Sequence, residues 1–247
     1  MQESSWPERL SVVRHGESAG NVARDLAEAE RLEAIDIAER DIDVPLSERG
    51  ELQAAALGRW IAEQAENERP TVVWASPYVR AQQTAQIALK ESGLDLPVVL
   101  DERLREREFG VLDRLTRHGI IARFPEESER RARLGKFYHR PPGGESWADV
   151  ALRMRAVLDD VRRDYAGERV LIVAHQVVVL LSRYVLEHLT EKDVLAIDRL
   201  GDVANGSITS YRQHDGHLEL ERFNEIGHLA EHAAPVTAEP DVPVAPR

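Results

Sequence analysis

Four short runs of apolar, largely β-branched residues recur along the chain: LSVV (10–13), TVVWA (71–75), PVVL (97–100) and RVLIVA (169–174). Runs of this length and composition are typical of buried parallel strands. Stretches with helical spacing of apolar residues lie between them. Because strands and helices alternate, the pattern predicts an α/β fold with a mainly parallel, doubly wound sheet.

Capping residues locate the starts of three helices. One helix is expected to begin at Ser47. A second follows the Ser-Pro pair, with Ser76 as the N-cap and Pro77 in the first helical position. A third opens at Ser146, whose spacing from Asp149 approaches that of a capping box. The third helix has an apolar stripe formed by Trp147, Val150, Met154, Val157 and Val161.

The alternating elements occupy residues 1–228, which we interpret as a single domain. Residues 22–43 form an acidic excursion with eight acidic residues against three Arg. This insertion is interpreted either as a solvated helical face or as a lid over the site. Residues 229–247 are rich in Pro and Ala and are predicted to be a disordered tail.

Composition narrows the class of protein. An apolar fraction of 43% and a charged fraction of 31% are typical of a soluble globular chain. The absence of cysteine excludes disulfides, thiolate metal sites and a cysteine nucleophile. A net charge of −12 argues against nucleic acid or an anionic membrane as the partner. We expect a cytoplasmic location, since no signal sequence is visible. Whether the chain forms a homodimer is left open.

The triplet Arg-His-Gly occurs twice, at 14–16 and at 117–119. His15 directly follows the first apolar run, at the carboxyl end of a predicted strand, where α/β sheets bind ligands. His118 lies in a stretch predicted to be helical, with no strand before it. We therefore expect His15, and not His118, to carry chemistry.

Further polar residues follow the other predicted strands. His175 comes after RVLIVA, and Ser76 and Arg80 come after TVVWA. Together with Arg14, such groups at helix starts favour a bound anion, of which phosphate is the usual one. A metal site is the alternative use of two histidines, but the chain has no HExxH pair and no cysteine. A serine hydrolase would need a G-x-S-x-G elbow, which is absent.

Six segments occur in an order that resembles the histidine phosphatase superfamily, also called phosphoglycerate mutase-like. They cover roughly residues 10–210 and read RHGESAGN, PLSERGELQA, ASPYVRAQQTA, LREREFG, RPPGGES and VAHQ. The resemblance implies a three-layer α/β sandwich with helices on both faces of the sheet. It also implies a phosphohistidine mechanism that needs no metal and no organic cofactor.

The resemblance assigns roles position by position, with His15 as the nucleophile. The rest of the phosphate pocket is then formed by Arg14, Asn21, Arg80 and His175. Glu106 matches the acid of the family, since the motif L-R-E-x-x-F-G places this residue four positions before Gly110. Glu108, two residues further on, is out of register with that motif.

The chain departs from the family after the second histidine, where Gln176 replaces the usual Gly. The fructose bisphosphatase domains of the bifunctional regulatory enzyme look similar there, and Gln176 is a candidate substrate ligand. Those domains also share an aromatic and basic run before GES, which here reads KFYHRPPG. Lys136, Tyr138 and Arg140 are therefore candidates for binding the non-reacting part of a substrate, or else surface residues of a loop.

The sequence predicts a phosphomonoester hydrolase that acts through a phosphohistidine on a small anionic phosphorylated metabolite. A phosphoglycerate mutase is the alternative within the fold. The span from Glu106 to His175 looks too short to cover a phosphoenzyme and keep water out, which favours the hydrolase. An inactive protein that only binds phospho-ligands is the alternative from another class.

Overall fold

A six-stranded sheet forms the centre of the computed structural model, which describes residues 6–238. Its strand order is β3-β2-β4-β1-β5-β6. The first four strands in this order are parallel, whereas β5 pairs antiparallel with β1 and β6 pairs antiparallel with β5. The strands are β1 (Arg9–Arg14), β2 (Val72–Ala75), β3 (Val98–Leu100), β4 (Arg169–Ala174), β5 (Ile208–His214) and β6 (His217–Glu225). The prediction of a mainly parallel α/β sheet is confirmed.

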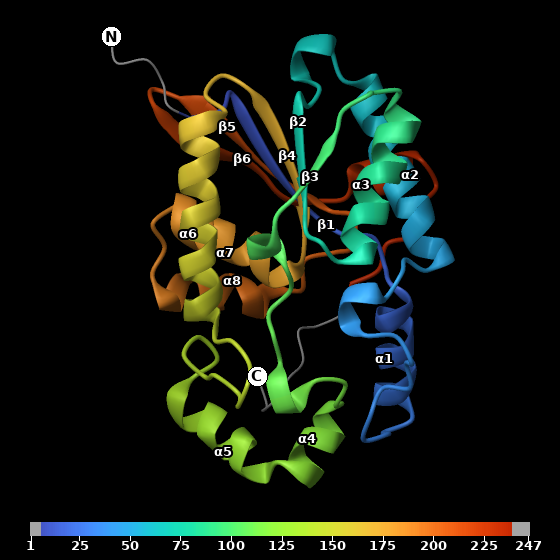
Figure 1. Ribbon diagram of the computed structural model, residues 1–247, viewed down its shortest axis with the longest axis vertical. Helices are drawn as coiled ribbons and strands as arrows, with labels where there is room; N and C mark the ends of the chain where they lie inside the picture. The colour runs from blue at the N-terminus through green and yellow to red at the C-terminus, as the bar shows by residue number, and fades with distance from the viewer. Residues whose placement is uncertain (1–5, 239–247) are drawn as a thin grey trace.

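Helices cover both faces of this sheet and make three layers (Figure 1). On one face lie α2 (Glu48–Glu63) and α3 (Val79–Ser92), packed on a core that includes Val13 and Val73. The other face is covered by α6 (Trp147–Asp164), α7 (Gln176–Leu186) and α8 (Glu191–Leu200). All five residues of the predicted α6 stripe are buried in this second core. The observed order of these strands and helices therefore agrees with the order predicted from the apolar residues.

A separate group of elements lies beyond the carboxyl ends of the parallel strands (Figure 1). It consists of α1 (Ala19–Ala29), the loop to residue 44, α4 (Arg117–Arg123) and α5 (Pro125–Leu134). We call residues 19–44 and 110–135 the cover. Its small core joins Ala34 to Leu115 and Ile120, and Gly119 lies so close to Glu33 that a Cβ would meet the Glu33 carbonyl oxygen at 1.8 Å. The acidic insertion thus packs on a distant part of the chain.

Two of the three predicted helix starts are confirmed. Ser47 and Ser146 are the N-caps of α2 and α6, and Ser146 forms the complete capping box with Asp149. The predicted start at Ser76 is wrong, since α3 begins at Val79 after the N-cap Tyr78. The Ser76 hydroxyl oxygen lies 2.8 Å from a ring nitrogen of His175 and is therefore part of the site.

The carboxyl-terminal region differs from the sequence expectation. The sequence reading did not include the β5–β6 hairpin, although its turn has the Asp215-Gly216 pair that favours tight hairpins. The tail prediction for 229–247 is wrong for residues 229–238. Leu229, in α9 (Gly227–Glu231), is buried, and Gln53 donates a hydrogen bond to the Pro235 carbonyl oxygen at 2.8 Å. The remaining residues of that predicted tail lie outside the described part of the chain.

Candidate active site

Three parallel strands end side by side, and each is followed by a polar residue. In the β1–β4 register Arg14 pairs with Ala174, so His15 and His175 leave adjacent strands at the same level. The His15 amide donates to the Ala174 carbonyl oxygen at 2.9 Å. The Ser76 amide donates to the Val173 carbonyl oxygen at 2.9 Å, which places Ser76 on the other side of β4. Ligands of α/β sheets bind at this kind of edge.

The His15 ring is oriented by its own neighbour. Its Nδ1 lies 2.6 Å from the carbonyl oxygen of Gly16, which can only accept a hydrogen bond. Nδ1 therefore carries the proton of the neutral ring, and the lone pair is on Nε2. Gly16 is required because a Cβ would lie 2.5 Å from the Gly50 carbonyl oxygen. This arrangement places the lone pair of the neutral ring on Nε2, the nitrogen that could attack an electrophile.

Both histidines are held in the neutral form. Burial lowers the pKa of His15 well below its ordinary value of 6.5, and the charges of Arg80 and Arg14 lower it further. Burial also lowers the pKa of His175, with Arg80 as the next cause. A neutral imidazole is what a nucleophile at phosphorus needs, because its attacking lone pair must be unprotonated.

His175 lies across the site from His15, with the ring centroids 5.1 Å apart and an angle of 66° between the ring planes. Its Nε2 lies 2.8 Å from the Ser76 hydroxyl oxygen. Its Nδ1 lies 3.7 Å from Oε2 of Glu106. The two histidines expected to face each other do so, and the acid assigned by the family motif lies beside them.

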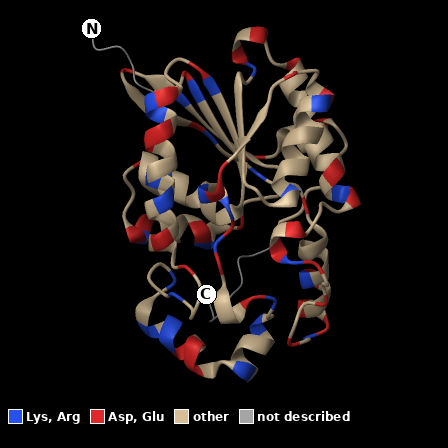
Figure 2. Ribbon diagram, in the orientation of Figure 1, with Lys and Arg blue, Asp and Glu red and all other residues tan. Residues whose placement is uncertain are grey.

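Two arginines complete the cationic part of the site. Arg14 is buried, and its Nη1 donates to the Val203 carbonyl oxygen. Arg80 is the second residue of α3 and is also buried. Its guanidinium group lies 4.7 Å from the ring centroid of Tyr78 and contacts Asp41 from the cover. Acidic and basic side chains are interspersed over the ribbon (Figure 2), so the net charge of −12 does not prevent a local cluster of cations.

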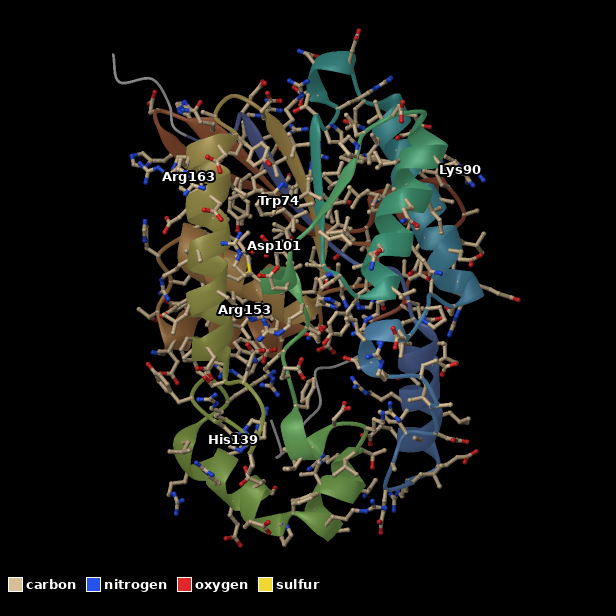
Figure 3. All side chains as sticks on the ribbon, in the orientation of Figure 1. Trp74, Lys90, Asp101, His139, Arg153 and Arg163 are labelled. Carbon is tan, nitrogen blue, oxygen red and sulfur yellow. The ribbon has the colours of Figure 1, made fainter. Side chains whose placement is uncertain are left out.

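Glu106 and Glu108 are clearly separated by the structure. Glu106 lines the pocket, whereas the Glu108 side chain is 49% exposed and accepts a long 3.4 Å hydrogen bond from the Tyr78 hydroxyl. Arg153, which is labelled on α6 in Figure 3, donates to the Glu106 carbonyl oxygen at 3.2 Å. Arg153 also pairs with Glu145 at 3.0 Å. The register argument therefore selected the residue that faces His175.

Asn21 and Gln176 both line the pocket. The Asn21 side-chain oxygen accepts hydrogen bonds from the backbone and hydroxyl of Ser18, which closes the capping box of α1. Its Nδ2 group is thereby turned away from Ser18, and no hydrogen bond within residues 6–238 uses it. Gln176 is the first residue of α7, and its Nε2 donates to Asp202 at 3.3 Å.

The cleft around these groups opens to solvent. One wall comes from the strand ends and the other from the cover. The cover contributes to this wall Gly20, Asn21, Arg24, Ile35, Ile37, Glu39, Asp41, Val44, Asp113 and Arg114. Part of the insertion at 22–43 therefore lies over the site, as the lid interpretation requires.

The sequence model of the histidine phosphatase superfamily (branch 1) matches residues 10–226, which include every group of this site. The chain belongs to the histidine phosphatase superfamily. A 2,3-bisphosphoglycerate-dependent phosphoglycerate mutase of Methylobacterium radiotolerans is 36% identical over 191 residues, or 76% of this chain and 83% of that protein. A 6-phosphofructo-2-kinase/fructose-2,6-bisphosphatase of Caenorhabditis elegans is 32% identical over 174 residues, or 70% of this chain and 33% of that protein.

Solved structures agree with the family. A mycobacterial glucosyl-3-phosphoglycerate phosphatase superimposes with a TM-score of 0.68 at 27% identity, covering 89% of this chain and 99% of that one. The relatives of this chain therefore include proteins named as mutases and proteins named as phosphatases.

Three candidate ligands from the run before GES lie outside the pocket lining. Lys136 pairs with Asp198 of α8 at 2.8 Å, so its ammonium group is directed to the helical layer. The Tyr138 side chain is exposed, and Arg140 donates to the Gly144 carbonyl oxygen within its own loop. In this structure they are residues of a loop outside the pocket lining, and their assignment as substrate ligands stays a prediction. His118 is exposed at the start of α4, as expected.

Sequence reasoning missed two residues that shape the site, Asp41 and Arg24, and one contact within it. Ser76 is expected at the strand end that faces the anion, but the sequence does not indicate its contact with the His175 ring. Asp41 and Arg24 were read only as members of a charge run. Their positions in the sequence do not predict a place in the site, because only the tertiary packing of the cover brings them to the pocket.

Residues 6–238 contain no group of three or more His, Cys, Asp or Glu side chains arranged to hold a metal ion. The same residues include no helix long and apolar enough to cross a membrane.

Proposed function

We propose that this chain is a phosphomonoester hydrolase that acts through a phosphohistidine at His15 on a small anionic phosphorylated metabolite. The observation that carries the proposal is the 2.6 Å contact between His15 Nδ1 and the Gly16 carbonyl oxygen. That contact presents an unprotonated Nε2 between two buried arginines. The family membership supports a covalent phosphohistidine at this position.

In the first step His15 Nε2 attacks the phosphorus atom, and the bond from phosphorus to the ester oxygen breaks. The ester oxygen leaves with the bonding electrons and takes a proton from Glu106. Negative charge on the phosphoryl oxygens is met by Arg14, Arg80 and a hydrogen bond from His175. Such fixed positive groups supply most of the rate in phosphoryl transfer.

In the second step Glu106, now a carboxylate, accepts a proton from water while the water oxygen attacks phosphorus. The bond between phosphorus and Nε2 breaks, and its electron pair returns to His15. Inorganic phosphate leaves, and Glu106 is protonated again. General acid and base help of this kind is worth roughly 10²–10⁴-fold.

A mutase is the second candidate, because the curated relative from Methylobacterium radiotolerans is named a phosphoglycerate mutase. The span between Glu106 and His175 also contributes α4 and α5 to the cover, which is more than the sequence reading allowed. Charge favours the hydrolase. Glu39, Asp41 and Asp113 line the pocket. A bisphosphate intermediate would be held poorly beside these carboxylates.

The deciding experiment supplies phosphomonoesters to the purified protein with EDTA present and measures free phosphate. In parallel, 3-phosphoglycerate with a trace of the bisphosphate is supplied, and both 2-phosphoglycerate and phosphate are followed. We expect phosphate from several monoesters and no isomer. If the isomer forms much faster than phosphate, the chain is a mutase and the hydrolase proposal fails. If neither forms, the protein is an inactive binder.

Arg24 is expected to bind the second anionic group of the substrate. It lies one helical turn beyond Asn21 on α1, lines the pocket and is half-buried, and its Nε has no hydrogen-bond partner within the described residues. We expect Arg24→Gln to raise KM for 3-phosphoglycerate by about tenfold, the value of a charge-assisted hydrogen bond. KM for nitrophenyl phosphate should change less than twofold.

Arg31→Gln, an exposed arginine of the same insertion, is the matched control and should alter neither KM. An equal rise of KM for both substrates in Arg24→Gln would show that Arg24 acts on the phosphoryl group or on folding. In that case the second anion is bound elsewhere.

A further inference from the structure

The guanidinium group of Arg80 is already occupied by a carboxylate of the chain itself. Arg80 Nη1 donates to Oδ1 of Asp41 at 3.0 Å and to its backbone oxygen at 2.6 Å. Nη2 donates to Oδ2 at 3.4 Å. These are the two nitrogens with which a guanidinium group binds a phosphoryl group side by side. Asp41 therefore holds the position that the substrate needs.

The pair is not a buried structural ion pair. The Arg80 side chain is 6% exposed, but that of Asp41 is 42% exposed. A carboxylate with this exposure can turn into water without losing its hydration, and half-exposed pairs contribute little to stability. Two anions on one guanidinium repel each other, so the phosphoryl group and the Asp41 carboxylate exclude one another.

The loop that carries Asp41 is fixed on both sides. Before it, Arg114 donates to the carbonyl oxygens of Ile37 at 3.1 Å and Glu39 at 2.5 Å. Arg114 has a φ of 58°, a conformation that side chains other than glycine adopt at a cost, and it is held there by these contacts. After it, Ala19 donates to the Pro45 carbonyl oxygen at 2.9 Å. The Asp41 carboxylate can thus leave Arg80 by side-chain rotation, while its backbone oxygen keeps the guanidinium in place.

We propose that Asp41 is a specificity-determining residue whose carboxylate competes with the phosphoryl group for Arg80 and so sets the affinity of the site for phosphate. The proposal rests on the proposed function only in taking Arg80 as the phosphate ligand. It assigns to the acidic insertion a direct part in phosphate binding. Asp43 does not share this part, since it pairs with the exposed Arg40.

The test measures binding of inorganic phosphate to the full chain by calorimetry at low and at physiological salt. Asp41→Asn keeps the size and the backbone contact but removes the competing charge. We expect phosphate to bind about two- to fivefold more tightly to this variant, with the larger gain at low salt. Asp43→Asn, in the same short helical turn, is the matched control and should bind phosphate as the wild type does.

A double-mutant cycle with Arg80→Gln identifies the cause. If Asp41 competes for Arg80, the gain from Asp41→Asn disappears when Arg80 is absent. A gain that persists in the Arg80→Gln background would show a general effect of charge and overturn the proposal. Weaker phosphate binding in Asp41→Asn would also overturn it, because Asp41 would then position Arg80.

Phosphate binding needs no turnover, so the two proposals fail separately. If the wild type hydrolyses monoesters but Asp41→Asn does not bind phosphate more tightly, only the proposed role of Asp41 is contradicted. A gain in phosphate affinity without hydrolysis of any monoester contradicts the hydrolase and leaves the competition for Arg80 standing.

Discussion

His15→Ala should lower turnover by at least about 10⁴-fold, because removal of a covalent nucleophile leaves only binding and electrostatic help. His118→Ala should stay within a few-fold of the wild type. The two residues share the same local sequence, but His15 is buried at the end of β1 with its Nδ1 on Gly16, whereas His118 is exposed on α4. Turnover of nitrophenyl phosphate by the three proteins checks the prediction.

Circular dichroism and thermal unfolding of both variants must match the wild type before activity is compared. Rapid quench with a substrate labelled on its phosphoryl group should show acid-labile labelling of the wild type and of His118→Ala. The His15→Ala variant should not be labelled. An inactive His118→Ala variant that is still folded would mean that the site is not at the end of β1.

Glu106→Gln should slow substrates with poor leaving groups by about 10²–10³-fold, within the range of acid catalysis. Nitrophenyl phosphate should be slowed far less, since nitrophenolate leaves without a proton. The reason lies in the geometry, which places the Glu106 carboxylate 3.7 Å from His175 and inside the pocket. The measurement is kcat for a series of alkyl and aryl phosphates of graded leaving-group pKa.

Glu108→Gln is the control, because this side chain is half exposed and lies outside the pocket lining. It should leave the dependence on the leaving group unchanged. Equal slowing of all substrates by Glu106→Gln would show that Glu106 orients His175 and transfers no proton.

The residues at the strand ends could be predicted because they follow directly from local sequence. An apolar β-branched run ends at residue 13, and the polar residues that follow must emerge at the carboxyl edge of the sheet. His15, Ser76 and His175 are found there for this reason. Glu106 follows no strand directly, and only its register against Phe109-Gly110 indicated it.

The wall formed by the cover could not be predicted in the same way. The contacts between Arg80 and Asp41, and between Arg114 and the loop at 37–39, join residues far apart in the chain. A run of charged residues in the sequence does not indicate which acidic side chain will contact which arginine. The hairpin β5–β6 is a different case, because Asp215-Gly216 between alternating residues was a usable signal.

The place of β1 within the sheet has a consequence for how the protein is made. Residue 14 pairs with residue 174, and residue 13 with residue 208, so both neighbours of β1 in the sheet are made long after it. The site around His15 therefore cannot form until residue 208 has been synthesised. Closing such long loops makes folding slow, and until then the apolar strand around Val12 is exposed to chaperones and to other nascent chains.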